Sequence, residues 1–471
     1  MAAEPLRLDF GLSSDPGRHG ADAGPMHWNC YAEPVTEGKH PAPIYAHDGW
    51  DTFAASTATS PIRGMIGLGQ AIYVLQGTTL SRVSSTGVRS SVGGIAGTAR
   101  AVMARNAKSG TPQIAIVVDG DRYVCENDVI SPIDDADLPP PNSVTFLNQK
   151  VVYGLPDGRF FWSAIDDVSS ISSLDFAEAE GSPDGGVRVI AHMQDLWVFG
   201  TETIEPWRDT GNGFARVQGT VIPKGCVGAH TVAQLDKDIF WVGDDNVVYM
   251  ASGIGGFQRI SHHGVERAIR TTADKNELVG WTYFRDGSAF YVLRGDTWTW
   301  QYNRTYQHWA PRFSYDSTVG RWNAEYAVQV ANQWIVGSNV NDALFELNAS
   351  THSEAGQPII WRARCAPIHA FPRQMCHDRL FLDFVTGVGL NSTTAHEMTP
   401  QVGLRWSDDG GVRWPNQRLK SLGLIGKRQT RVVFDGLGIT GRSGRIYEVE
   451  ASAPVVRALM YAAVDGDLVG T

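Results

Sequence analysis

The chain has 471 residues and a net charge of −10, and it is 42% hydrophobic, with 51 Gly, 15 Trp, 14 Tyr and 18 Phe. This length allows two or three ordinary domains, or one large β architecture with a smaller partner, and the Gly and aromatic content favours strands and tight turns over helices. The acidic balance excludes a reader of DNA sequence. A duplex carries one phosphate charge per ~1.7 Å and repels an acidic protein. If the protein contacts DNA, we therefore expect it to act as a wall beside the duplex and not to read the bases.

The first 61 residues are rich in Pro, Gly and His, and strand-like patterns appear only at HWNCYAEP and APIYAHDGWDTF. We predict an extended arm over residues 1–61 that either adds a closing strand to the next domain or reaches a neighbouring subunit. No basic segment leads into an apolar core here, so we expect no secretion signal. No apolar run approaches the roughly 20 residues that cross a bilayer, which predicts a soluble protein made in a cytosol.

Between residues 62 and 349 the sequence repeats one pattern, in which a short apolar run is followed by a glycine and an aromatic-rich run. The glycines that end the apolar runs are spaced by 43, 38, 42, 43, 52 and 42 residues. They are Gly77, Gly120, Gly158, Gly200, Gly243, Gly295 and Gly337. Many units carry a further strand-like run in front, such as VRVIAHM or EYAVQV, which gives three or four strands per unit.

Strand-only repeats of this length are typical of propeller blades. We expect the apolar run to be an inner strand between neighbouring blades, the glycine to take positive φ in the hairpin turn, and the following run to alternate, as in Trp298–Trp300. A blade cannot bury both faces alone, so the sheets must close into a ring. The sequence therefore predicts an all-β protein with a roughly seven-bladed β-propeller over 62–349. Two unrelated β-sandwiches are the alternative, and five intervals between 38 and 43 residues argue against it.

Three further segments complete the predicted organisation. The 52-residue interval has room for an insertion, and GVERAIRTTADKNELV, which ends at Val279, has helical spacing of its apolar residues. The polar stretch NASTHSEAGQP predicts a linker over 350–358. The strand-like segments beyond it predict a C-terminal antiparallel β-sandwich over 359–471. From Ile359 onward, 14 Lys and Arg stand against 10 Asp and Glu, so this part carries +4 and the rest of the chain −14.

The cysteines are five, far apart and never in C-x-x-C, which argues against a disulfide framework or a cysteine zinc site. We expect them to be small buried hydrophobes. They are Cys30, Cys125, Cys226, Cys365 and Cys376.

The stretch SDDGGVRW, Ser407–Trp414, matches the S-x-D-x-G-x-x-W Asp-box of sialidase propellers. In such a motif Ser407 and Asp409 would bond the turn backbone, Gly411 would take a special φ and Trp414 would pack on the sheet. Because the motif occurs once and outside the propeller region, it predicts a stabilised turn and not a catalytic site.

The loops of the repeat region contain an acidic stretch. Two carboxylates ~5–9 Å apart can hydrolyse glycosides, but nothing in the sequence fixes a pair at that distance, so we expect a solvated acidic rim. The residues are Asp166, Asp167, Glu178, Glu180, Asp184, Glu202, Glu205 and Asp209.

Two further clusters carry charge or metal-binding groups. His262 and His263 are followed by Glu266 one helical turn later, but no other His or Cys lies close by. The pair therefore predicts a surface turn rather than a metal site. A local basic cluster predicts a solvated strand edge, or a contact with an acidic partner surface or phosphate. Its members are Arg418, Lys420, Lys427, Arg428 and Arg431.

Two stretches resemble a signature of the packaged-DNA stabilization proteins of short-tailed phages. The family pattern A-E-x-x-P-D-x-x-[IV], then a buried strand and G-[ST]-x-T-[IV]-E-x-[WF], matches Ala179, Glu180, Pro183, Asp184, Val187, Gly200, Thr201, Thr203, Ile204, Glu205 and Trp207. RISHHGVERAIR, Arg259–Arg270, is similar to the R-I-S-x-x-x-[IV]-E-x-x-[IL] helix of that family. The arm, the repeats and the C-terminal strands with DRLFLDFVTGVG and LRWSDDGG come in the family's order, whereas the arm and the linker depart freely in sequence.

The resemblance implies a structural virion protein, a tail hub that plugs the portal or adaptor channel after genome packaging and retains the DNA. It implies a homo-hexamer that contacts the portal or adaptor ring, the tail needle and the tailspikes or fibres, in the virion tail after assembly in the host cytoplasm. DNA would pass through the channel without sequence-specific binding. An acidic lining would give it nothing to adhere to, with only charges within the ~8 Å screening length mattering. No catalytic, cofactor-binding or metal-ligating residue is predicted.

Two other functions compete with this reading. A propeller glycoside hydrolase acting on host surface polysaccharide is favoured only by the Asp-box and the acidic loops. A cellular propeller that scaffolds protein complexes would carry the G-H…W-D pattern, which is missing here.

Overall fold

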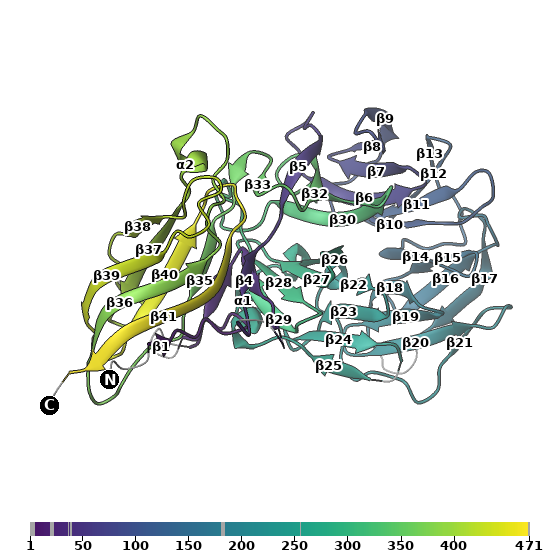
Figure 1. The fold of residues 1–471 in the computed structure, drawn as a ribbon. Helices are drawn as coiled ribbons and strands as arrows, with labels where there is room; N and C mark the ends of the chain where they lie inside the picture. Colours follow the sequence, from purple (N-terminus) through teal and green to yellow (C-terminus); the bar gives the residue numbers. More distant parts are fainter. Residues whose placement is uncertain are drawn as a thin grey trace.

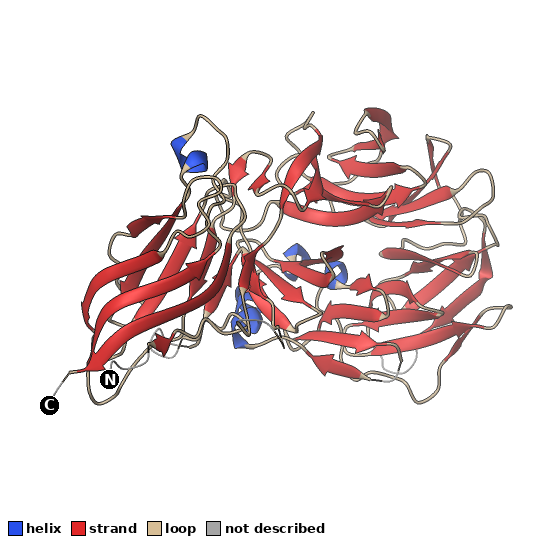
Figure 2. Ribbon diagram, in the orientation of Figure 1, coloured by secondary structure: helices blue, strands red, loops and turns tan. Residues whose placement is uncertain are grey.

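The computed structural model describes residues 5–18, 23–35, 37, 40–179, 184–254 and 256–469. Its regular structure is almost all β-strand, as Figure 2 shows, and a ring of small sheets lies beside a sandwich of two larger sheets (Figure 1). The described helices are α1 (His263–Thr271), α2 (Ala395–Met398) and the 3-10 turns Ala229–Thr231 and Lys275–Glu277. None of these helices combines the length and the apolar character needed to cross a bilayer.

Six sheets of four antiparallel strands follow one another along the ring. The first three are β6 (Ile62–Leu68), β7 (Ala71–Gln76), β8 (Thr79–Ser84) and β9 (Arg89–Gly94); β10 (Val102–Arg105), β11 (Gln113–Val118), β12 (Asp121–Glu126) and β13 (Val129–Pro132); and β14 (Ser143–Leu147), β15 (Lys150–Gly154), β16 (Arg159–Ser163) and β17 (Ile171–Glu178). The next three are β18 (Gly186–His192), β19 (Asp195–Gly200), β20 (Ile204–Asp209) and β21 (Phe214–Arg216); β22 (Ala233–Leu235), β23 (Asp238–Val242), β24 (Val248–Ser252) and β25 (Phe257–Arg259); and β26 (Val279–Arg285), β27 (Ser288–Arg294), β28 (Thr299–Asn303) and β29 (His308–Pro311).

The seventh sheet closes the ring with a strand from the N-terminal arm. Its order is β30 (Ala324–Val330), β31 (Gln333–Ser338), β32 (Leu344–Asn348), β5 (Gly49–Ala54), β33 (Ser353–Glu354) and β34 (Gln357–Pro358). Strand β5 pairs with β32 in the register Leu347 to Trp50. The arm therefore supplies a closing strand, the first of the two roles expected for it, and the described part of the chain forms seven blades.

Each pair of neighbouring blades shares its own apolar cluster, and this explains the continuous apolar runs. In β7, Tyr73 and Leu75 pack against the second blade, while Ile72 and Val74 on the opposite face pack against the seventh. A strand buried on both faces needs no polar alternation. The predicted ring of stacked blades is confirmed, but the apolar run is the second strand of each sheet. The innermost strands are those before it, and β30 of the last blade contacts β6 of the first.

The aligned glycines serve two different physical needs. Gly77, Gly120 and Gly158 take positive φ in the turn between the second and third strands, as predicted. The expectation is wrong for the other four, which have no positive φ. There the missing side chain makes room: a Cβ on Gly295 would lie 2.5 Å from the ring of Trp298. The four glycines of this second kind are Gly200, Gly243, Gly295 and Gly337, the last of which lies inside β31 and not after it.

Beyond the ring, two sheets form a β-sandwich, as predicted. One contains β3 (Cys30–Ala32), β4 (Ile44–Ala46), β41 (Ala458–Leu468), β36 (Met375–Phe384) and β39 (Val432–Ile439), with β1 (Leu6–Arg7) also paired to β41. The other contains β2 (Met26–Trp28), β35 (Trp361–Arg364), β40 (Ile446–Ala451), β37 (Gln401–Ser407) and β38 (Arg418–Ser421). A single apolar cluster fills the space between them, with Trp361, Leu380 and Val449 fully buried.

The arm and the predicted linker are both integrated into sheets. Strands β1–β4 of the arm belong to the sandwich and β5 to the ring. The stretch predicted as a linker contains the hairpin β33–β34, which extends the seventh blade beyond β5. The domain boundaries predicted at 61/62 and over 350–358 remain predictions. The predicted helix is confirmed as α1, inserted between β25 and β26 in the longest repeat.

The closing strand yields a first prediction. Trp50 is 2% exposed and stacks on Trp322 and Phe345, with ring centroids 5.3 Å and 5.0 Å apart. We expect Trp50→Ala to lower the free energy of unfolding by about 3–5 kcal/mol, because it removes a buried aromatic ring and leaves a cavity at the ring closure. Urea-induced unfolding followed by tryptophan fluorescence measures this. Leu174→Ala, at a position 84% exposed, is the control and should change stability by less than about 0.5 kcal/mol; equal effects of the two would contradict the role of Trp50.

Candidate functional site: the junction between ring and sandwich

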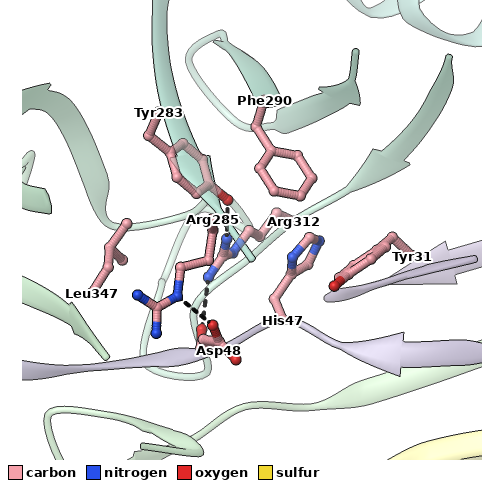
Figure 3. A pocket seen from close by; sticks show the side chains of 8 residues that line it. All are labelled: Tyr31, His47, Asp48, Tyr283, Arg285, Phe290, Arg312 and Leu347. Carbon is pink, nitrogen blue, oxygen red and sulfur yellow. Dashed lines mark hydrogen bonds and ion pairs between the residues drawn. The ribbon is translucent and has the colours of Figure 1, made fainter. Parts of the chain in front are cut away.

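Two residues carry the chain from the sandwich into the ring. Strand β4 ends at Ala46 and β5 begins at Gly49, so His47 and Asp48 span the junction between the two parts. Figure 3 shows them facing side chains of the sixth blade, with Tyr283 and Arg285 from β26 and Phe290 from β27. The junction is thus built where the arm, the sixth blade and the seventh blade meet.

Asp48 makes the ionic contact across this junction. Its carboxylate lies 2.6 Å from Nε of Arg285, and its backbone carbonyl accepts a hydrogen bond of 3.3 Å from Arg312. Burial raises the pKa of Asp48, while the hydrogen bond from Arg285 opposes this and the nearby Asp286 adds to it. The crossing is therefore fixed both through its backbone and through its side chain.

Arg312 is a buried cation without a carboxylate ion partner among the described residues. It is 3% exposed and donates to the Tyr283 hydroxyl at 3.0 Å and to Oε1 of Gln301 at 3.2 Å. Its guanidinium lies 3.5 Å from the ring centre of Trp322, a cation–π contact that the burial strengthens. A buried charge of this kind holds its neighbours in one geometry, because any displacement leaves donors without acceptors.

Glu354 anchors the same tryptophan from the other side. It is 5% exposed and accepts hydrogen bonds from the hydroxyl of Ser314 and from Nε1 of Trp322, the latter at 2.8 Å. Burial raises the pKa of Glu354 to about 7, although Arg312, Ser314 and Trp322 act in the opposite direction. In the parallel pairing of β33 with β5, Glu354 lies opposite Trp50. Glu354 therefore links the hairpin β33–β34 to the closing strand.

His47 completes the junction as a neutral acceptor. Burial, followed by the charge of Arg312, holds the pKa of His47 well below its usual range. Its Nε2 accepts from the amide of Gln301 at 3.2 Å, and its ring lies 5.0 Å from that of Tyr31. The space left between these side chains is about 10 Å³, room for a single water. The arrangement therefore holds the two parts together, and it has no room for a substrate.

The predicted Asp-box is confirmed as a stabilised turn of the sandwich. The Ser407 hydroxyl donates to Asp409 at 2.8 Å and accepts from the backbone of Gly411, whose φ is +88°. Asp409 accepts from the backbone of Arg413 at 2.9 Å. Trp414 packs beneath the guanidinium of Arg364 at 4.5 Å, which places it on the sheet as expected.

The acidic stretch is distributed over turns of the third and fourth blades. Asp184 accepts from the backbone of Glu202 and Thr203, both at 2.8 Å, and occupies the space that a Cβ on Gly200 would need. This contact joins two parts of the family signature, because Asp184 meets the segment Gly200–Thr203 here. Asp209 pairs with Lys150 at 3.3 Å. Glu180 lies outside the described residues, as do Gly181 to Pro183.

The remaining acids of that stretch do not converge on a common point. Asp167 accepts from Ser169 in its own turn, and Asp166 has a positive φ of 56° in that turn. Glu178 ends β17 and is exposed, whereas Glu205 is buried in β20 opposite Val198. Glu205 also lies 3.9 Å from Arg216. These carboxylates serve separate turns and strands.

The histidine pair begins the helix α1. Nδ1 of His262 accepts from the backbone of Gly264 at 3.0 Å and caps the helix, and Glu266 pairs with Arg259 at 2.6 Å. The pair thus begins a helix and is not a separate surface turn, because His262 is the N-cap and His263 the first residue of α1. Of the cysteines, Cys30, Cys125, Cys226 and Cys365 are buried as expected, while Cys376 is half-buried.

The basic cluster follows the edge strand β38 and the loop after it. Arg418 donates to the carbonyl of Asp435 at 2.9 Å and lies 4.7 Å from the ring of Trp406. Arg428 and Arg431 line a groove of about 1,320 Å³ on the sandwich, together with Arg379 and Tyr461. The edge position agrees with the first expectation, and a contact with an acidic partner stays a prediction.

Sequence reasoning missed the junction because its residues have ordinary neighbours. An arginine inside the aromatic run QHWAPRFSY was a usable signal for Arg312, since a charge in such a run is either exposed or held by specific partners. Glu354 had no such signal, because SEAGQ reads as a solvated turn.

Comparison with known families gives one broad match. The family model described as Bacteriophage P22 Gp10, beta-propeller, matches residues 26–352, from β2 through β32 of the seventh blade. Among curated proteins, no relative matches the sequence significantly.

Several solved propellers have a similar architecture. Selenomethionine-substituted virginiamycin B lyase from Staphylococcus aureus has a TM-score of 0.43 at 8% identity, over 61% of this chain and 94% of that chain. A streptogramin B lyase has a TM-score of 0.44 at 9% identity, and the WD40 beta propeller domain of Doa1 one of 0.43 at 10% identity, each over 64% of this chain and 97% of that chain. At these scores the likenesses say nothing about activity.

The raised pKa of Glu354 predicts a pH dependence of stability. The carboxyl titrates near 4.5 when unfolded and near 7 when folded, so between these values the folded state binds more protons. Its stabilising contribution is full below about pH 4.5 and is lost as the pH rises through 7. This titration should lower the free energy of unfolding of the native protein by on the order of 3 kcal/mol between pH 4.5 and 8. We expect Glu354→Gln to lack this decrease, so that its free energy of unfolding changes less over the same pH range.

The control is Glu178→Gln on the exposed end of β17, which should leave the native curve unchanged because water solvates that carboxyl in both states. A Glu354→Gln curve with the native slope would show that this carboxyl is ionised throughout.

Proposed function

The chain belongs to the phage packaged-DNA stabilization family, Bacteriophage P22 Gp10, beta-propeller, and from this premise we propose that it is the tail hub that plugs the portal or adaptor channel after packaging and retains the DNA. The observation that carries the proposal is the span of the family match, which includes β2–β4 of the arm, the closing strand β5 and the blades from β6 to β32. The match thus covers the elements that hold the ring closed.

The construction of the molecule supports a role under mechanical load. Seven separate apolar clusters fix the blades to one another, and the junction at Asp48 and Arg312 fixes the ring to the sandwich. Packed interiors of this kind have low compressibility and transmit strain. A stiff disc with turns on two faces can contact different partners on each, which a hub between a channel and a tail requires.

We propose that six copies assemble around the channel and contact the portal or adaptor ring, the tail needle and the tailspikes or fibres. The basic edge of the sandwich, from Arg418 to Arg431, suits an acidic partner surface, because the rest of the chain carries −14. We place the acidic ring part towards the DNA path, where it repels the duplex during ejection.

We further propose that the protein is a structural component of the virion tail without catalysis, assembled in the host cytoplasm. The two features that favoured a glycoside hydrolase have structural roles. The Asp-box holds a sandwich turn, and Asp184 holds a turn of the fourth blade. Reducing-sugar release from host polysaccharide that vanishes when one loop carboxylate is changed would contradict this.

The assembly is tested by mass. Native mass spectrometry or light scattering of the purified protein, with and without a purified portal or adaptor ring, should show six added copies of 51.3 kDa on the ring. A protein that stays a monomer in the presence of the ring contradicts the hub.

The acidic lining is tested by charge reversal. Glu202, Asp244 and Asp296 are exposed acids in the turn between the second and third strands of three blades, so they lie on the same face of the ring. Virions that carry Lys at all three should eject their genome more slowly, because the lining then attracts phosphate, and the delay should shrink at high salt. Real-time ejection from single virions measures the rate. Asp467→Lys, on the exposed end of β41, is the control; ejection at the native rate in both variants would contradict an acidic lining.

A further inference from the structure

A cavity of about 130 Å³ lies on the axis of the ring, at the end where the inner strands begin. Six of the seven blades contribute residues to its wall, among them Met65, Val102 and Val279. The polar groups in it are Arg188 from β18, His230 from the turn before β22, and Tyr326 from β30. A water needs roughly 10–15 Å³ of such space, so the cavity holds several waters or a small ion.

Arg188 lacks a carboxylate partner among the described residues. One of its terminal nitrogens donates to the carbonyl of Ala229 at 2.7 Å, whereas its Nε is buried and has no partner. Burial lowers the pKa of Arg188, which expresses how poorly its charge is solvated. A desolvated guanidinium with a free donor is the feature that anion sites in proteins use.

The surroundings of the cavity are positive in a chain that is acidic overall. Arg100 and Arg294 lie close by, and both pair with Glu325, which is 1% exposed. Glu277 contacts the same two arginines at 3.4 Å and 3.6 Å. These two acids are thus already engaged, and neither forms an ion pair with Arg188.

The histidine in the wall reports this positive field. Burial, followed by the charges of Arg188, Arg100 and Arg294, lowers the pKa of His230 to about 3. The three guanidinium groups therefore act together on one point of the wall.

Tyr326 is turned towards the axis by an irregular backbone. It has a φ of +63°, rare for a bulky residue, at a β-bulge between Glu325 and Ala327. Its hydroxyl donates to the carbonyl of Arg63 at 3.1 Å, and the side chain lines the same cavity as Arg188. Strain of this kind persists where the surroundings impose it, and here it brings a polar group to the cavity.

We propose that this axial cavity binds a small oxyanion of the phosphate class, held by the guanidinium of Arg188 and by the Tyr326 hydroxyl, whose proton turns from the Arg63 carbonyl to the anion, with His230 beside it. The anion supplies the negative charge that Arg188 lacks. Because the wall comes from six blades, a bound anion joins them at the centre of the ring and strengthens its closure. The volume suits a free ion, and the terminal phosphate of a nucleoside monophosphate presents the same chemistry.

Binding is measured with inorganic phosphate on the purified full-length protein, by isothermal titration calorimetry against chloride at equal ionic strength. We expect saturable binding and a rise in the melting temperature that saturates at the same concentration. We also expect the His230 imidazole, followed by NMR, to titrate at a higher pH once phosphate is bound, because the anion offsets the arginine charges. AMP is the second probe: exclusion of AMP assigns the site to the free ion, and equal binding of AMP places its terminal phosphate in the cavity.

Three variants make the test specific. Arg188→Gln should weaken phosphate binding at least tenfold, and Tyr326→Phe, which removes one hydroxyl, by about tenfold. Arg208→Gln is the matched control, since Arg208 is 57% exposed on the outer part of the same blade and pairs with Asp195. If Arg188→Gln fails to fold, Tyr326→Phe and the His230 titration decide. Absence of saturable binding, or binding by Tyr326→Phe and Arg188→Gln at the native affinity, overturns the proposal. The outcome is independent of the hub assembly, which is measured on the ring.

Discussion

Ring closure by β5 is the constraint on which the rest of the molecule depends. Each blade has two apolar faces, so the seven sheets are stable only when the last packs against the first. The chain completes the last blade with a strand laid down before the other propeller strands, and it extends that blade by the hairpin at Glu354. The ring is therefore closed by segments that lead directly into the sandwich, and the stability of the two parts cannot be separated.

The sequence contained the repeat, because stacking imposes the same burial on every blade. Apolar runs such as AIYVLQ must be buried on both sides, and this leaves a readable pattern at nearly constant spacing. The order of strands inside a blade was not readable, since some innermost strands, such as VMAR and AQL, are only three or four residues long and contain an exposed polar residue. The physical role of each glycine was not readable either. Glycine occurs both where space is needed, as at Gly295, and where a positive φ is needed, as at Gly77, so the sequence does not distinguish the two.

The junction shows why charged residues resist such prediction. Arg312 and Glu354 are buried through contacts with Trp322, which lies between them in sequence but packs against a strand from residue 50. No local pattern encodes a contact with a segment about 270 residues away. From their sequence neighbours alone, Arg312 and Glu354 would therefore be predicted to lie in solvent. By contrast, the turn of the Asp-box could be predicted, because the hydrogen bonds of Ser407, Asp409 and Trp414 fall within Ser407–Trp414. Predictability followed the sequence separation of the contacts.

The order of strands also fixes when the fold can form. Strand β5 pairs with β32, so the ring cannot close before the chain has been made to Asn348. Strands β1–β4 need partners from β35 and β41, which come later still. Pairings of such high sequence separation form slowly, because loop entropy must be overcome before the contact is gained. Releasing β5 also disturbs the crossing at Asp48, whose ends are held in the sandwich and the ring. Opening of the ring is therefore coupled to the sandwich through this crossing.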